Sequence, residues 1–315
     1  MSETDVEQAL QEIPGVRSGA ETVSRGIHDA VLQGGEPARA VADVLHGKWL
    51  GHPLHPALTD FVVGAWSFGS LLNLMPDRDG NGDNSKAAQT LMGMGIVAAV
   101  PTALAGVTDF STISKRAMST GATHGILNTV ALGCYLLSRW TGRNGSRSSS
   151  KVYSTLGFGV LMASAWLGGK MTYEYRIGVN KSAKAEGPTD WTDVIGEAEL
   201  ADGQPRRIEV EGTAVLLYRK GNEVYAIGAV CSHEGGPLEE GDFSDCCVQC
   251  PWHQSVFDLS TGDVVHGPAT YTLPHFDTRI SNGRIQLRLG REGEANRNQA
   301  PEYSSAMPAE DRARH

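Results

Sequence analysis

The 315-residue chain lacks several features that would place it in common functional classes. It has no cluster of Lys and Arg, and its formal net charge is −9, which together argue against a nucleic-acid partner. It has no Gly-rich dinucleotide fingerprint, so a nicotinamide or flavin cofactor would have to sit on another protein. No secretory signal is visible, because the first apolar stretch begins near residue 56, too far along the chain for cleavage.

Charge is almost absent from four segments, although the mean hydropathy of the whole chain is slightly negative. A helix needs about 20 mostly apolar residues to cross a bilayer. Two of the segments meet that length, one nearly does, and the first does so if residues 55–60 are counted as interfacial. All four are rich in small residues, which let membrane helices pack closely. The alternative is a buried soluble bundle, whose helices would keep a charged face. We therefore expect an α-helical four-span transmembrane bundle formed by residues 61–75, 87–108, 117–138 and 152–169.

The sequence pattern changes after residue 180, from long apolar runs to short strands. Residues 284–289 alternate with a period of two, and the dipeptide Asn282-Gly283 before them is a strong hairpin signal. The pattern predicts a multi-domain protein with an N-terminal membrane bundle and a C-terminal all-β domain. We divide the chain into a polar, partly helical segment (1–45), a four-helix transmembrane domain (46–180), a linker (181–189), an all-β domain (190–290) and a tail expected to be disordered (291–315).

Four of the five cysteines lie in one stretch of twenty residues inside the all-β domain, and two histidines lie close to them. Such crowding is typical of a metal site rather than of a disulfide framework. The arrangement is Cys231-Ser232-His233, a gap of sixteen residues, and then Cys250-Pro251-Trp252-His253. Structural zinc usually takes its cysteines as one pair and its histidines as another, whereas each cluster here supplies one of each. This pairing suits a [2Fe–2S] centre with two Cys on one iron and two His on the other.

Two segments resemble the cluster-binding loops of Rieske proteins, namely residues 231–238 (CSHEGGPL) and 250–258 (CPWHQSVFD). Gly267-Pro268-Ala269 resembles the proline-containing third loop that covers the cluster in that family. The resemblance implies an all-β Rieske-type domain with one [2Fe–2S] cluster. It also implies the ligands of that cluster, with the inner iron on the cysteines and the outer, more exposed iron on the histidines: Cys231, Cys250, His233 and His253.

The sequence departs from the Rieske proteins of cytochrome bc complexes, which carry an extra cysteine in each loop. Gly236 and Trp252 stand at those places, so the resemblance implies a ferredoxin-type domain without the loop disulfide. Ser255 matches a serine that hydrogen-bonds a bridging sulfide, whereas Phe257 replaces a tyrosine that hydrogen-bonds a ligand thiolate. Because such hydrogen bonds raise the reduction potential, we expect a potential below the bc type.

The expected surroundings of the cluster are thus Ser255, Phe257, Trp252, Leu238 and Pro268. Cys246 and Cys247 do not match any ligand position of the family. We expect them to be free thiols on a loop beside the cluster, because nothing else in the chain completes a second site.

The membrane half also has a resemblance. Residues 45–60 (LHGKWLGHPLHPALTD) and the four apolar segments are similar to a family of small bacterial membrane proteins whose function is not established, and the resemblance implies only the topology. Ionisable groups in membrane segments are costly and often functional, so a bis-histidine haem or a quinone pocket is one interpretation. The other interpretation, which we favour, is that these groups cap helices and form hydrogen bonds in a turn at the membrane interface. The residues concerned are His52, His55, Asp60, Asp109 and His124.

The first functional hypothesis is a membrane-anchored, ferredoxin-like electron carrier with unknown redox donor and acceptor proteins. A self-contained Rieske oxygenase needs a further iron held by two His and a carboxylate, and the 62 residues after His253 leave no room for that domain. Two alternatives stay open: a ferredoxin component that serves a separate oxygenase or reductase, and a redox-sensing or structural subunit of a membrane complex. We expect an electron carrier or an oxidoreductase component rather than a self-contained enzyme, and we assign no catalytic residues.

The expected location is the cell membrane, with several spans in the lipid bilayer. Basic residues near the span ends are almost evenly divided between the two sides, so charge does not fix the orientation. Iron–sulfur clusters are assembled in the cytoplasm, and no twin-arginine signal precedes a span. We therefore expect the Rieske-type domain on the cytoplasmic face.

Overall fold

The computed structural model describes residues 15–76, 82–182 and 187–290. The tail at 291–315, which was expected to be disordered, lies outside the described residues, as do residues 1–14 and part of the expected linker. The chain divides into two compact units, each considered by itself. Unit 1 contains residues up to 29 together with 53–178, and unit 2 contains residues 30–52 together with those from 179 onward.

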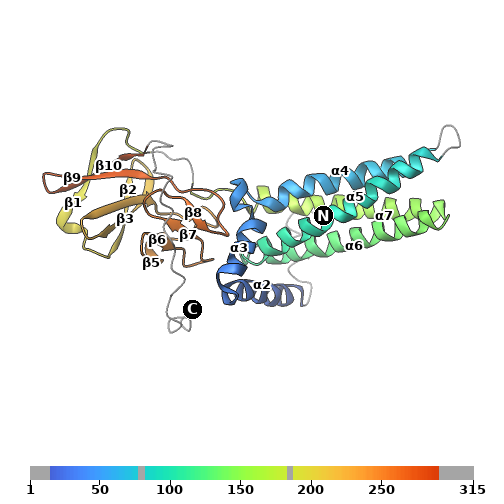
Figure 1. Cartoon of the computed structure of the whole chain (residues 1–315), viewed down its shortest axis with the longest axis horizontal. Coiled ribbons are helices and arrows are strands. Elements are labelled where there is room, and N and C mark those ends of the chain that lie inside the picture. The colour runs from blue at the N-terminus through green and yellow to red at the C-terminus, as the bar shows by residue number, and fades with distance from the viewer. Residues whose placement is uncertain (1–14, 77–81, 183–186, 291–315) are drawn as a thin grey trace. The chain divides into compact units, whose positions relative to one another are not determined.

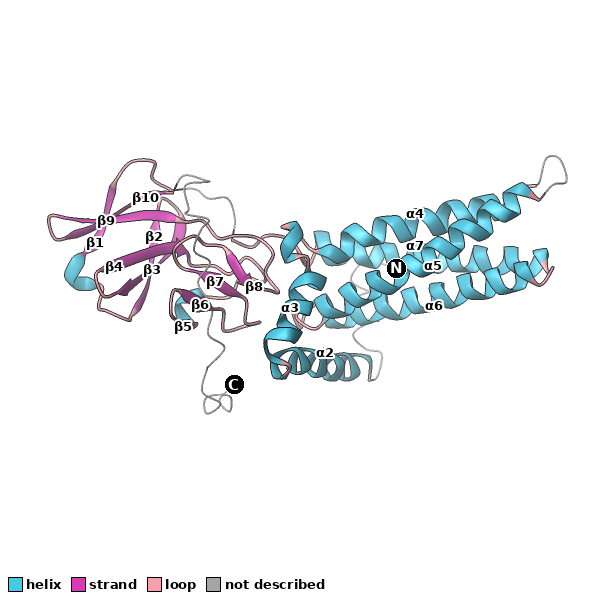
Figure 2. Ribbon diagram, viewed as in Figure 1, coloured by secondary structure: helices cyan, strands magenta, loops and turns pink. Residues whose placement is uncertain are grey.

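Four long helices make up most of unit 1, and each contains all but at most one residue of one of the four apolar segments (Figures 1 and 2). Each of α4 and α6 packs against both α5 and α7, so α4 and α6 are diagonal to one another. Their bounds are α4 (Leu54–Leu74), α5 (Asp83–Phe110), α6 (Met118–Arg143) and α7 (Arg147–Tyr173).

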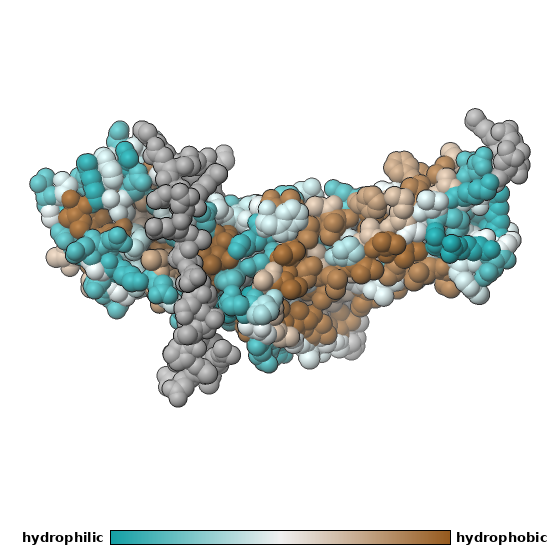
Figure 3. All heavy atoms as spheres, in the orientation of Figure 1, coloured by the Kyte–Doolittle hydropathy of each residue, from teal (hydrophilic) through white to brown (hydrophobic). Residues whose placement is uncertain are grey.

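Among the described helices, α4, α5 and α7 are long and apolar enough to cross a membrane. Helix α6 is also long, but polar residues such as Asn128 and Arg139 lower its hydropathy, and it is not among the candidate spans. The expected count of four spans is therefore not confirmed. On the visible face, apolar residues cover the middle of these helices (Figure 3). Val97 and Val100 of α5 are 74% and 60% exposed, which is typical of a surface in contact with lipid rather than water.

The interior of the bundle depends on close helix approach. Trp66 of α4 stacks on Tyr135 of α6, with ring centroids 4.4 Å apart and planes 20° apart. The Tyr135 hydroxyl lies 3.0 Å from Ser70 Oγ, so this buried polar group is satisfied. Gly95 makes room for the indole, because a Cβ at that position would lie 2.3 Å from Trp66. Small residues thus set the helix spacing.

The N-terminal helices are shared between the units. Helix α2 (Val16–Gln33) packs at one end of the bundle, where Ser24 Oγ donates a hydrogen bond to the backbone oxygen of Ser111 at 3.1 Å. Helix α3 (Gly35–His46) and the short 3₁₀ helix η1 (Lys48–Leu50) belong to unit 2.

The remainder of unit 2 is all-β, as expected, and contains three antiparallel sheets with strand orders β1-β10-β9, β2-β3-β4 and β5-β6-β7-β8. The predicted hairpin is confirmed: Asn282 and Gly283 both have positive φ and connect β9 to β10, where Ser281 pairs with Arg284. The bounds are β1 (Thr192–Gly196), β2 (Pro205–Val210), β3 (Thr213–Lys220), β4 (Glu223–Gly228), β5 (Asp242–Ser244), β6 (Cys247–Gln249), β7 (Val256–Asp258), β8 (Val264–His266), β9 (Phe276–Ser281) and β10 (Arg284–Leu289).

The contact between Gly95 and Trp66 yields the first prediction. Gly95→Ala should destabilise the bundle by about 1–3 kcal/mol, because the added methyl group overpacks a fully enclosed indole. Gly133→Ala on α6 is the matched control, since a Cβ there meets no atom within 4 Å. Thermal unfolding in detergent, followed by far-UV circular dichroism, measures both. Equal stability of the two variants would contradict this account of the packing.

Candidate metal centre

Two loops bring the four expected ligands together. Cys231 and His233 follow β4, and Cys250 and His253 lie between β6 and β7. The two thiols are within hydrogen-bond distance of each other and are only 1% and 2% exposed. The imidazoles of His233 and His253 lie edge to face with centroids 5.0 Å apart, and both are partly exposed. The structure therefore places a buried pair of sulfur ligands next to a pair of nitrogen ligands nearer the surface.

The two loops share one backbone pattern. In the first, the amide of Cys231 donates to the oxygen of Gly236 at 2.9 Å, and the amide of Gly235 donates back to the oxygen of Cys231 at 3.0 Å. In the second, the amide of Cys250 donates to the oxygen of Ser255 at 2.8 Å, and the amide of Gln254 donates back to the oxygen of Cys250 at 3.1 Å. The residue four positions after each cysteine has positive φ, at 84° for Gly235 and 64° for Gln254. Each cysteine thus begins the same tight turn.

This turn aims backbone N–H groups at sulfur. Cys231 Sγ accepts from the amides of His233 and Glu234, and Cys250 Sγ accepts from those of Trp252 and His253. The hydrogen bond between the two thiols lowers the pKa of Cys250 to about 7 and, together with burial, raises the pKa of Cys231. A lowered pKa favours the thiolate, which is the form of cysteine that binds metal.

The donor set fits two irons better than one zinc ion. Zinc in a structural site is held by four ligands around a single point. Within residues 15–76, 82–182 and 187–290, no three His, Cys, Asp or Glu side chains are grouped as one ion requires. Two adjacent pairs, one of sulfur and one of nitrogen, are what a Rieske-type [2Fe–2S] cluster uses. Gly236 leaves the space around the sulfur open, since a Cβ there would lie 2.8 Å from Cys250 Sγ.

The expected surroundings lie near these loops. Leu238 and Phe257 are fully buried in the same hydrophobic core as both cysteines. Ser255 Oγ accepts the amide of Ala269 at 3.0 Å and so links the second loop to the third, where Pro268 is buried. Trp252 is 54% exposed, so an aromatic surface flanks the histidine pair.

The two additional cysteines and one acidic residue complete the vicinity. Cys246 and Cys247 are free thiols, the first half-buried and the second buried at the start of β6. Burial raises the pKa of Glu234, next to His233, to about 7, against the opposing charge of Lys181. Sequence reasoning did not single out Glu234.

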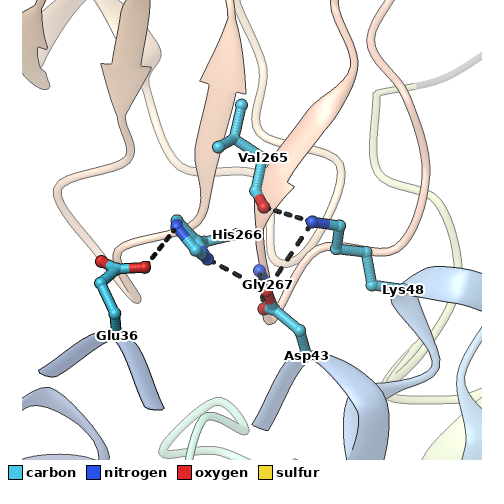
Figure 4. A network of polar contacts seen from close by, with 6 residues as sticks. All are labelled: Glu36, Asp43, Lys48, Val265, His266 and Gly267. Carbon is cyan, nitrogen blue, oxygen red and sulfur yellow. Dashed lines mark hydrogen bonds and ion pairs between the residues drawn. The ribbon is translucent and has the colours of Figure 1, made fainter. Parts of the chain in front are cut away.

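Helix α3 holds the third loop, and sequence reasoning missed this contact entirely (Figure 4). The Asp43 carboxylate accepts hydrogen bonds from the amide of Gly267 at 2.7 Å and from Nδ1 of His266 at 3.0 Å. Lys48 Nζ lies 3.7 Å from the same carboxylate, and Glu36 Oε2 lies 3.5 Å from His266 Nε2. Helix α3 and Lys48 therefore contact the third loop directly.

Protein hydrogen-bond donors and one positive charge surround the Asp43 carboxylate. Burial acts to raise its pKa, but the hydrogen bonds from His266 and Gly267 and the charge of Lys48 outweigh burial and hold the pKa below 3.8. The side chain is therefore ionised at neutral pH, and it stabilises the folded state as long as it remains so.

The five expected residues of the membrane site are only partly brought together. His55 and His124 face each other inside unit 1, with ring centroids 6.3 Å apart. Asp60 is exposed on α4, Asp109 is half-buried near the end of α5, and His52 belongs to unit 2. The structure therefore brings His55 and His124 together within unit 1.

Comparison with known families confirms both expected resemblances. Residues 190–277 match the Rieske [2Fe-2S] domain, and residues 51–181 match a predicted membrane protein family (DUF2231). Residues 190–277 are thus a Rieske domain that holds one [2Fe–2S] cluster, fused to a domain of that membrane family. Electron transfer is the chemistry that such a cluster supplies.

Relatives of known role match about a third of this chain. The chain is 35% identical over 94 residues to apoptosis-inducing factor 3 of Mus musculus, and these residues are 30% of this chain but only 16% of that protein. It is 27% identical over 99 residues to the ferredoxin component of the naphthalene 1,2-dioxygenase system of Pseudomonas putida, covering 31% of this chain and 95% of that protein. Among solved structures, the ferredoxin of carbazole 1,9a-dioxygenase from Nocardioides aromaticivorans IC177 is 28% identical, covering 32% and 98% of the two chains with a TM-score of 0.31.

The contact of Asp43 with the third loop yields the second prediction. Asp43→Ala should lower the free energy of unfolding of unit 2 by about 1.5–3 kcal/mol, the usual cost of losing hydrogen bonds to a charged group. Because the folded pKa lies below the ordinary value of 3.8, the stabilisation is present above that value and is lost as pH falls through the folded pKa. Denaturation followed by the visible circular dichroism of the cluster, from pH 3 to 7, measures it.

The matched control is Glu36→Gln on the same helix, which also faces His266 but is 45% exposed. An exposed pair is worth about 0–1 kcal/mol, so this change should be nearly silent. Equal effects of the two changes, or an Asp43→Ala effect that grows toward acid, would show that the carboxylate does not hold the loop.

Proposed function

We propose that this protein is a membrane-anchored one-electron carrier whose Rieske domain works as a ferredoxin does. The observation that carries the proposal is the pair of matching turns that place two buried thiols and two partly exposed imidazoles side by side. The match of residues 190–277 to the Rieske family supports it. The ferredoxin-sized relatives, which this chain covers almost in full, also support it.

Each ligand has a distinct role in this proposal. Cys231 and Cys250 hold the inner iron, where burial and backbone N–H groups keep sulfur away from water. His233 and His253 hold the outer iron, and their partial exposure provides the shortest way for an electron to leave the domain. Trp252 next to them offers a flat apolar surface on which a partner protein can dock without covering the imidazoles.

The membrane domain serves as the anchor. We propose that α6 crosses the bilayer together with the three candidate spans, because it packs along the full bundle between α5 and α7. Four spans return the chain to the side from which it entered, and we place the Rieske domain on the cytoplasmic face. The donor and acceptor are separate redox proteins; an oxygenase or reductase system is one such pair, as the dioxygenase ferredoxins suggest.

The third prediction tests the centre. Anaerobically purified protein should contain two irons and two acid-labile sulfides and give a Rieske-type electron paramagnetic resonance signal on reduction, with reversible redox titration. Cys250→Ala and His233→Ala should each abolish the signal, because an iron with an open coordination site is not retained. Cys246→Ala is the matched control and should leave the signal unchanged. Stoichiometric zinc without iron or sulfide in the unaltered protein would refute the assignment.

The fourth prediction tests the anchor. The full chain should stay in the membrane pellet through high salt and alkaline carbonate, because ions do not screen the burial of apolar surface. Val97→Arg should reduce insertion, since Arg at the centre of a span costs about 2.5–3.5 kcal/mol. Asn84→Arg, at the start of the same helix, should insert normally. Full recovery of the unaltered chain in the supernatant without detergent would contradict the anchor.

A further inference from the structure

The helical bundle is built from two equivalent hairpins, α4–α5 and α6–α7. Equivalent positions are 69 residues apart on α4 and α6, and 62 residues apart on α5 and α7. Five of the six buried residues of α5 have a buried counterpart at that spacing on α7. These pairs are Ala88 and Ser150, Met92 and Ser154, Gly95 and Gly157, Thr102 and Ser164, and Ala105 and Leu167.

The aromatic centre of the bundle follows the same rule. Trp66 and Tyr135 are 69 residues apart and stack on each other. Each ring also lies against a glycine of its own hairpin, since a Cβ would lie 2.3 Å from Trp66 at Gly95 and 3.2 Å from Tyr135 at Gly157. The two rings therefore occupy equivalent positions in the two hairpins.

His55 and His124 are a third equivalent pair on α4 and α6. Nδ1 of His55 lies 2.9 Å from the backbone oxygen of Thr102, and Nδ1 of His124 lies 2.9 Å from that of Ser164. Both carbonyls belong to equivalent positions on α5 and α7. The two hairpins thus hold their imidazoles in the same way.

Each imidazole also rests against a glycine one helical turn beyond that carbonyl. A Cβ at Gly106 would lie 2.7 Å from His55, and one at Gly168 would lie 3.2 Å from His124. The same cradle of a carbonyl and a glycine is therefore present twice, and the two rings that it holds are 6.3 Å apart and nearly perpendicular.

The hydrogen bonds determine which nitrogen is basic. A backbone carbonyl can only accept, so Nδ1 carries the proton in both rings and Nε2 carries the lone pair. The amide of Asn128 donates to Nε2 of His124 at 3.0 Å. The equivalent residue on α4, Thr59, donates to the backbone oxygen of His55 at 2.8 Å instead. Within the described part of the chain, Nε2 of His55 therefore has no donor.

We propose that His55 and His124 are the two axial ligands of one haem iron held inside the bundle. Metal-binding histidines almost always donate their other ring N–H to an oxygen such as a backbone carbonyl, as both do here. The ligands come from diagonal helices and face the core, where bundles build cofactor sites. With metal–nitrogen bonds of about 2 Å on opposite sides of one ion, the separation of 6.3 Å between ring centres is the right size.

The number of ligands selects haem over a bare ion. No third His, Cys, Asp or Glu joins the pair among the described residues, and a porphyrin supplies the remaining four nitrogens itself. A quinone would need hydrogen-bond donors at its carbonyl oxygens, whereas both Nε2 atoms are acceptors. Basic residues at this end of the bundle, in the α5–α6 loop and after α7, match the carboxylates of haem: Lys115, Arg116 and Arg176.

The test uses the full chain, expressed with a haem precursor and purified in detergent, with hemin added in a parallel sample. We expect one haem per chain by pyridine haemochrome assay, and a sharp low-spin optical spectrum after reduction with dithionite. His55→Ala and His124→Ala should each lose the low-spin spectrum. His52→Ala, three positions away, should keep it. His55→Met should also keep a low-spin haem, because methionine is an axial ligand of haem iron as well.

The outcome is independent of the cluster, because Cys250→Ala should lose the Rieske signal and keep the haem spectrum. Absence of haem in both samples would overturn the proposal. So would stoichiometric copper or zinc bound by the two histidines, or a low-spin spectrum that survives in the double variant His55→Ala/His124→Ala. Failure of His55→Met to bind haem while the bundle still unfolds at its normal temperature would likewise count against axial ligation.

Discussion

The Rieske domain depends on keeping two sulfur anions close together where water does not reach. Burying one unpaired charge costs several kcal/mol, and two like charges add their repulsion. The chain offsets this cost with hydrogen bonds from backbone amides rather than from side chains. Four amide N–H groups, two from each loop, point at Cys231 and Cys250, and these dipoles cannot move away when the charge on the cluster changes. In the proposed function, bound iron would neutralise the charge that remains, so the site is complete only with metal.

The need to aim amides at sulfur accounts for the shape of the loops. A chain that turns back within five residues needs one residue with positive φ, which glycine adopts freely and other residues adopt at a cost. Gly235 meets the requirement in the first loop, whereas Gln254 adopts the same conformation in the second. The second loop therefore carries strain that the first does not. Hydrogen bonds within the loop and the bond from the amide of Ala269 to Ser255 Oγ hold it in place.

Local patterns explain which parts of this structure the sequence predicts. Ligand spacing, the Asn282-Gly283 turn and the charge-free runs each occupy a few consecutive residues, so they can be read directly. The contact of Asp43 with Gly267 joins residues 224 positions apart, and no local pattern marks Asp43 as different from any other helical aspartate. Helix α6 shows the opposite problem, because here a local pattern predicted more than the structure supports. Its apolar run predicted a span, but its polar residues lower the mean hydropathy and α6 is not among the candidate spans.

The repeated hairpins were hidden for another reason. Their equivalence lies in single residues at fixed spacing, such as Trp66 with Tyr135, and the residues between them differ. Size and shape, not identity, are what packing preserves, since a bundle accepts any pair that fills the same volume. Histidine is different, because its function depends on a particular nitrogen. That His55 and His124 remain identical while their neighbours Thr59 and Asn128 diverge is what chemistry, rather than packing, would preserve. In both units, then, a pair of proposed metal ligands arises where one backbone arrangement occurs twice.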